Sequence, residues 1–107
     1  MSDGASTAEA MAEAVVAAGI SSIFAYPGDP IIEFMEKCRA RGVDVVLARR
    51  EATAAFMAEG FAQATGRPGV CLSTLGPGST ALVNEVAAAH LDRVPMLAIS
   101  AQIERAR

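Results

Sequence analysis

Tryptophan is absent from the 107 residues, and histidine and cysteine are scarce, with one and two copies. Cys38 and Cys71 stand far apart and lack the short spacing of zinc-ligand pairs, which argues against a metal site or a disulfide framework built on cysteine. Two isolated cysteines are typical of a reduced, cytoplasmic protein, and we expect both thiols to be buried or partly buried. No metal-binding residues are expected in this chain.

A strong excess of charge of one sign and long apolar runs are also missing. The net charge is −3, and acidic and basic residues are interspersed without the basic stripe that nucleic acids require. No apolar run approaches the roughly 18 residues of a membrane-spanning helix. The polar start, residues 1–7, shows no signal-peptide pattern. We therefore expect a cytoplasmic protein that binds neither nucleic acid nor membrane.

Hydrophobic residues, many of them alanine, make up 52% of the chain. This fraction excludes disorder and favours closely packed helices. A chain of this length forms one small domain whose core is only just large enough for stability. We expect residues 1–107 to form a single domain.

Helical and strand patterns alternate along the chain, separated by glycine and proline. Ser6 followed by Glu9 reads as a capping box that opens a helix ending near Gly19. Further helices are expected over residues 31–41, 51–65 and 79–90, and strands over 22–26, 43–48, 69–75 and 95–100. This alternation predicts an α/β fold with a parallel sheet of about four strands, flanking helices and right-handed crossovers.

The second expected strand contains the run Val45, Val46 and Leu47, which favours a strand buried on both faces. In a parallel sheet, chemistry gathers where the strands end. Those ends carry mostly glycine, proline or charged residues here: Tyr26-Pro27-Gly28-Asp29, Arg49-Arg50-Glu51, Thr74-Leu75-Gly76-Pro77-Gly78 and Ser100-Ala101-Gln102. The fold alone thus directs attention to one rim.

Taken locally, each rim element has an ordinary explanation. Glu51 opens a helix, where an acid complements the helix dipole. The Gly76-Pro77-Gly78 segment is either a plain turn or a loop whose backbone approaches a ligand closely. It lacks the P-loop lysine and the G-x-G-x-x-G pattern, so a nucleotide-phosphate site has weak support. Asp29 is either a general acid or, as local sequence favours, the cap of the next helix.

Taken together, six short motifs form an ordered set with defined spacing. They are Gly19-Ile20, Phe24-Ala25-Tyr26-Pro27-Gly28, Arg50-Glu51, the nine residues from Ala58 to Gly66, Gly76-Pro77-Gly78 and Asp92-Arg93-Val94-Pro95-Met96. The set resembles the pyrimidine-binding (PYR) domain of thiamine-diphosphate enzymes in the acetolactate synthase, pyruvate oxidase and pyruvate decarboxylase superfamily. The match over residues 8–102 implies a partial, truncated PYR domain with a flavodoxin-like fold.

The resemblance implies a role for each rim residue. Glu51 is expected to hydrogen-bond the pyrimidine ring of thiamine diphosphate and to promote the imino tautomer that activates C2 of the cofactor. A carboxyl group in a closed cleft of low dielectric suits this proton sharing. The pyrimidine pocket is expected to be lined by Tyr26, Pro27, Gly28, Gly76, Pro77 and Gly78. The substrate is expected to be a 2-oxo acid.

The reaction type follows less directly from the resemblance. Asp29 matches an active-site acid of the decarboxylases, whereas Gln102 matches a glutamine near the reacting centre of acetolactate synthase-like members. Ala81 departs from an asparagine that is common after the Gly-Pro-Gly turn. We expect an acetolactate synthase-like transferase or lyase, with a 2-oxo-acid decarboxylase as the alternative. A non-catalytic dimerising module with the same fold is a further alternative.

In the family, the cofactor diphosphate and Mg²⁺ are held by a separate domain marked by Gly-Asp-Gly, and this sequence contains no such triplet. The resemblance therefore implies a partner, the diphosphate-binding (PP) domain of the same or another chain, in a homodimer or larger oligomer. FAD is possible in the complete enzyme. The chain by itself is not expected to catalyse a reaction.

Overall fold

A computed structural model describes residues 6–102 as four strands and five helices. All strand pairs are parallel, in the order β2-β1-β3-β4, which confirms the predicted α/β fold. The elements in chain order are α1 (Thr7–Ala17), β1 (Ser22–Ala25), α2 (Asp29–Ala40), β2 (Asp44–Leu47), α3 (Glu51–Thr65), β3 (Gly69–Ser73), α4 (Pro77–Thr80), α5 (Val83–Leu91) and β4 (Met96–Ser100).

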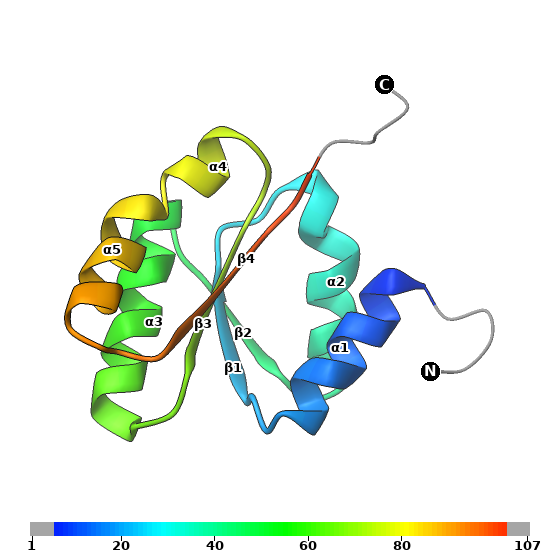
Figure 1. Cartoon of the computed structure of the whole chain (residues 1–107). Coiled ribbons are helices and arrows are strands. Elements are labelled where there is room, and N and C mark those ends of the chain that lie inside the picture. Colours follow the sequence, from blue (N-terminus) through cyan, green and yellow to red (C-terminus); the bar gives the residue numbers. More distant parts are fainter. Residues whose placement is uncertain (1–5, 103–107) are drawn as a thin grey trace.

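The sheet separates two layers of helices. Helices α1 and α2 cover one face, and α3, α4 and α5 lie over the other (Figure 1). Alternate strand residues enter two separate cores, so that Leu72 of β3 packs under α1 and α2 while Cys71 packs under α3 and α5. Because both faces are covered, the central strand β3 is buried along its whole length.

Two helix ends are set by the residues expected from the sequence. The Ser6 side chain accepts a hydrogen bond of 3.1 Å from the Glu9 backbone N–H, which confirms the predicted N-cap of α1. Gly66 ends α3 with φ of 72°, a left-handed conformation that glycine adopts without steric cost.

The prediction of one helix over residues 79–90 is wrong, because the structure has α4 and α5 there. Pro77 already has the backbone angle of a first helical residue, so α4 begins earlier than predicted. The Leu82 N–H then bonds to the Ser79 carbonyl, three residues back, at 3.1 Å. This tighter bond interrupts the regular four-residue ladder, and α5 starts afresh at Val83.

The prediction that the Val45–Leu47 strand is buried on both faces is also wrong. Strand β2 is an edge strand, Val45 and Val46 are half-buried, and the Leu47 side chain is 58% exposed. An apolar run does not reveal whether a strand lies at the edge of a sheet, because the order of crossovers decides that position.

Candidate functional site

The carboxyl ends of all four strands meet at one rim of the sheet, at the top of Figure 1. Along the rim, the order is Glu51 after β2, the segment 26–29 after β1, the segment 74–78 after β3, and Gln102 after β4. Strands lie about 4.8 Å apart, so the ends of β1 and β4 are separated by about 10 Å. The fold therefore brings the four predicted segments onto one rim.

Glu51 is the first residue of α3 and is half-buried. Helix α3 follows the edge strand β2, but the crossover carries it over β1 and onto β3. This path brings the first turn of α3 next to the turn that follows β3. Glu51 thus lies at the positive end of the α3 helix dipole.

Gly78 lies directly beside the Glu51 carboxylate. A Cβ atom added to Gly78 would lie 3.4 Å from Glu51 Oε2 and 2.9 Å from Thr74 Cγ2. Gly78 is buried, whereas Gly76 and Pro77 are exposed at the outside of the same turn. A Cβ atom at Gly76 would meet nothing within 4 Å, so of the two glycines in this turn Gly78 is the one that lies against Glu51.

Gly28 borders the same corner through its packing against Thr74. A Cβ atom added to Gly28 would lie 2.8 Å from Thr74 Cβ. The preceding residue, Tyr26, is half-buried and donates its backbone N–H to the Leu72 carbonyl at 3.3 Å, which ties the end of β1 to β3. Pro27 is exposed. Gly28 and Gly78, which come from different loops, thus both pack closely against Thr74, and neither position admits a larger side chain without displacing it.

Thr74 lies between these two glycines and was not among the predicted site residues. Its side chain borders the positions that a Cβ atom would take at both Gly28 and Gly78. Its carbonyl accepts hydrogen bonds from the hydroxyls of Ser73 at 3.2 Å and Ser79 at 3.3 Å. The sequence offered one signal for Thr74, namely its position directly after a buried strand. A threonine at such a position does not by itself indicate a functional role.

Asp29 does not cap α2 through its side chain, contrary to the prediction favoured by local sequence. The N-cap residue is Gly28, which has no side-chain cap, and Asp29 is the first helical residue. Helix α2 starts earlier than predicted because Pro30 is compatible with the first turn of a helix. Asp29 and Gln102 are both exposed at the rim, as are Arg49 and Arg50.

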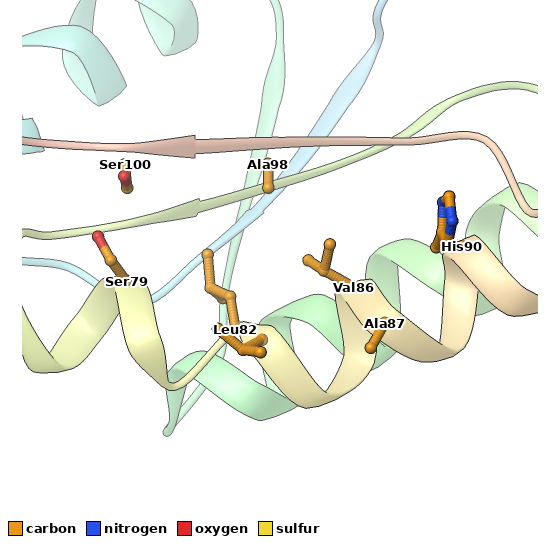
Figure 2. Close-up of a pocket in the computed structure, with 8 residues that line it drawn as sticks. Ser79, Leu82, Val86, Ala87, His90, Ala98 and Ser100 are labelled. Carbon is orange, nitrogen blue, oxygen red and sulfur yellow. The ribbon is translucent and has the colours of Figure 1, made fainter.

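Beside the rim, an open groove of about 460 Å³ runs between α5 and β4 (Figure 2). Ser79 and Ser100 lie at its end near the rim, His90 lies at the other end, and Leu82, Val86 and Ala98 line the middle. Glu51 and Gly28 do not line this groove. Its apolar lining and lack of acidic groups separate it chemically from the corner around Glu51.

The described part of the chain offers little support for a metal site or a cysteine nucleophile. Within residues 6–102, no three side chains of histidine, cysteine, aspartate or glutamate gather where they would hold a metal ion. Both cysteines are buried, as predicted, and burial raises the pKa of the Cys71 thiol to about 11. Cys71 is therefore a neutral core residue and not a nucleophile.

The structure defines an α/β domain with a carboxylate and a corner bordered by glycines at one rim. Similarity to known protein sequences identifies its family. Residues 5–107 match the family of the thiamine pyrophosphate enzyme, N-terminal TPP binding domain. This match covers nearly the whole chain, so the chain belongs to that family. The predicted PYR-domain identity is thereby confirmed.

Three relatives show which enzymes carry similar sequences. The chain is 41% identical over 99 residues to a chloroplastic acetolactate synthase of Arabidopsis thaliana, covering 92% of this chain and 15% of the relative. Identity is 44% over 98 residues to acetolactate synthase 2 of Nicotiana tabacum, with 91% and 15% covered. Identity is 42% over 96 residues to a probable acetolactate synthase large subunit of Methanocaldococcus jannaschii, with 90% and 16% covered.

The chain spans about one sixth of the length of these relatives. It is a PYR domain similar to those of acetolactate synthases, and its family binds thiamine pyrophosphate. Within residues 6–102, none of the helices has the length and apolar character needed to cross a membrane.

Proposed function

We propose that this chain is the pyrimidine-binding portion of a thiamine-diphosphate-dependent enzyme that acts on 2-oxo acids, in the manner of acetolactate synthase. The observation that carries the proposal is the position of the Glu51 carboxylate next to Gly78, where an added Cβ atom would lie 3.4 Å from Oε2, while Gly28 packs against the same Thr74 side chain as Gly78. The Glu51 carboxylate offers a hydrogen-bonding group, and the backbone of the adjoining Gly78 carries no side chain that would keep a ligand at a distance.

We propose that the pyrimidine end of the cofactor binds at this corner. Cβ atoms at Gly28 and Gly78 would collide with Thr74, so both positions present backbone without a side chain. We propose that Gly28 and Gly78 border the ring, that Tyr26 and Pro27 shape one wall, and that Gly76 and Pro77 hold the turn. When bound, thiamine diphosphate supplies the carbanion-stabilising chemistry that side chains lack.

The role that we propose for Glu51 is to hold a proton at Oε2 and share it with a ring nitrogen of the pyrimidine. This hydrogen bond would favour the imino tautomer of the ring and so promote activation of C2. Closing the cleft with a partner domain would exclude water and strengthen this proton sharing. The half-buried position of Glu51 in the described chain leaves one side open to such a partner.

Asp29 and Gln102 are the residues that we propose to face the substrate. Both are exposed at the rim, where a substrate in a cleft between two domains would meet them. An acid at Asp29 would serve protonation in a decarboxylase, whereas an amide at Gln102 would orient the second substrate of a carboligase. The similarity to acetolactate synthases favours the carboligase.

The proposed partner is a PP domain that holds the diphosphate through Mg²⁺, supplied by the same or another chain. The comparisons support this because the relatives are several times longer than the chain. FAD in the complete enzyme and a cytoplasmic location are further parts of the proposal. The two free thiols, Cys38 and Cys71, support a reducing compartment.

Replacing Glu51 by glutamine in the complete enzyme tests the proposal. The amide keeps the shape but does not take up a proton, so we expect exchange of the C2 proton of bound thiamine diphosphate to slow by about 100-fold or more. Exchange is followed by NMR in deuterium oxide, and cofactor affinity is measured separately. Glu33→Gln, an exposed change on α2, is the control. Normal exchange in Glu51→Gln would overturn the mechanism.

A second candidate, a non-catalytic dimerising module, is favoured by one observation. Helices α3 and α5 expose large apolar side chains, with Phe56 56%, Val83 61% and Leu91 80% exposed. Such exposure is typical of surfaces covered by another protein. Light scattering of the chain and of Phe56→Glu tests this candidate, because a monomer at high concentration in both proteins would discard it.

A further inference from the structure

Thr74 occupies the centre of the corner that separates Gly28 from Gly78. It follows β3 directly, and its side chain is half-buried. A Cβ atom at Gly28 would lie 2.8 Å from Thr74 Cβ, 3.1 Å from Oγ1 and 3.2 Å from Cγ2. On the other side, a Cβ atom at Gly78 would lie 2.9 Å from Thr74 Cγ2. The side chain therefore packs against the backbones of two loops at once.

The chemical nature of threonine suits a fixed spacer. Two heavy atoms on Cβ restrict rotation about the first side-chain bond, so the methyl group keeps one position. The Thr74 carbonyl is held by hydrogen bonds from the Ser73 and Ser79 hydroxyls at 3.2 and 3.3 Å. The Gly78 N–H bonds to the Leu75 carbonyl at 3.2 Å and closes the turn that follows Thr74.

The same methyl group has consequences for Glu51. The space at the Cα atom of Gly78 is bordered on one side by Thr74 Cγ2 and on another by Glu51 Oε2. If the turn moved toward Thr74, the gap between Gly78 and the carboxylate would widen. A shift of this kind at a reacting group is costly, since about 1 Å of misplacement can cost about 100-fold in rate.

We propose that Thr74 is a positioning residue whose methyl group sets the separation between the Gly28 loop and the Gly78 turn, and thereby the place of the pyrimidine ring relative to Glu51. The purpose of this spacing rests on the proposed function. The packing itself is a property of the chain and can be measured without the cofactor.

Two double-mutant cycles test the packing through the melting temperature of the 107-residue chain. Gly78→Ala and Gly28→Ala are each expected to lower Tm by about 5–10 °C through overpacking. Thr74→Ala removes Cγ2 and Oγ1 but keeps Cβ, which is the nearest atom to a Cβ at Gly28. It is therefore expected to recover at least half of the Gly78→Ala loss and a clearly smaller part of the Gly28→Ala loss. Equal recovery in both cycles, or none in either, would overturn the proposed packing.

Binding of thiamine, which has the pyrimidine but no diphosphate, tests the purpose of the spacing. Titration is followed by the NMR shifts of glycine amides in the chain. Thr74→Val keeps the branched shape and is expected to bind like wild type, whereas Thr74→Ser loses the methyl and is expected to bind at least threefold more weakly. Thr53→Ser, the same change at an exposed site on α3, is the matched control.

The outcomes separate the two proposals. If the wild-type chain shows no thiamine-dependent shift, the proposed function fails, and with it the purpose given to Thr74, while the cycles still decide the packing. If valine weakens binding and serine does not, Thr74 acts through its hydroxyl and the positioning role is overturned. That role also fails if serine lowers Tm but leaves thiamine affinity unchanged, because Thr74 would then be merely structural.

Discussion

The two faces of the sheet are packed with side chains of different size. Under α1 and α2 the core contains large residues such as Ile31, Phe34 and Met35. Under α3 the corresponding positions are small, with Ala54 and Ala58 fully buried against the sheet. Large side chains bury apolar area and keep a helix at a distance, whereas alanines let the backbone of a helix come close.

The close approach of α3 fixes the position of Glu51. At Gly69 an added Cβ atom would overlap the Ala58 carbonyl, so the start of β3 and the middle of α3 are in direct backbone contact. The α3 and α5 face also buries polar groups, namely Glu59, Ser73 and Glu85. The difference indicates that one face supplies most of the hydrophobic stability while the other positions the candidate site.

The largest effect is expected from a substitution in the core under α1 and α2, which contains the large side chains. Phe34→Ala should lower the free energy of unfolding by about 3–5 kcal/mol, through lost burial and a residual cavity. Urea denaturation measures this loss. Phe56→Ala, which trims an exposed ring on α3, should change stability by only about 0.5 kcal/mol. Equal losses in the two variants would contradict the division between the faces.

The second effect is expected from a substitution where the backbones of α3 and β3 are in contact. Gly69→Ala should cost about 3 kcal/mol, because backbone must move to admit the methyl group. It should also shift the Gly78 amide resonance, since α3 would carry Glu51 away from the turn. Gly60→Ala is the matched control, since a Cβ atom there meets open space inside α3 and should stabilise the chain by about 0.5–1 kcal/mol. A Gly69→Ala chain as stable as wild type would disprove the close packing.

The third effect compares one buried thiol on each face as pH rises. Burial raises the pKa of Cys71 from an ordinary 9.0 to about 11, and burial also raises the pKa of Cys38, although Arg41 opposes that rise. The folded chain thus keeps the Cys71 proton that the unfolded chain releases. The stabilisation is complete below pH 9 and is lost as pH rises through 11, a change of about 2–3 kcal/mol.

Urea denaturation of Cys71→Ala and Cys38→Ala at several pH values from about 8 to 11, the range in which thiols titrate, checks this comparison. The fall in stability should be shallower in Cys71→Ala than in wild type, and less altered in Cys38→Ala. An unchanged slope in Cys71→Ala would show that the thiol is not the group responsible.

The smallest expected effect has the opposite sign and removes a buried polar group from the α3 and α5 face. The Glu85 side chain is 2% exposed, its Oε1 accepts a 3.0 Å bond from the Asn84 side chain, and its Oε2 has no partner within residues 6–102. Glu85→Met should therefore raise the free energy of unfolding by about 1–2 kcal/mol. Glu33→Met, on the exposed side of α2, is the control and should have little effect on stability. Destabilisation by Glu85→Met would show that the Glu85 carboxyl group has hydrogen-bond partners in solution.

The sequence predicted most of the elements because their signals are local. The Ser6 cap, the Gly66 helix end and the positions of all four strands follow from neighbouring residues. Three predictions failed for identifiable reasons. The helix at 79–90 is broken by a local change of hydrogen bonding, Asp29 lies inside α2, and Leu47 is exposed because β2 is an edge strand.

The sequence by itself determined the α/β class, the alternation of elements and the presence of Glu51 at the start of a helix, since these depend on residues within one or two turns of each other. The tertiary structure alone decided that Glu51 Oε2 faces Gly78 and that Thr74 lies between Gly28 and Gly78. These residues come from loops after three different strands. They meet only because the crossover of α3 and the order β2-β1-β3 bring distant segments to one rim, which no local pattern encodes.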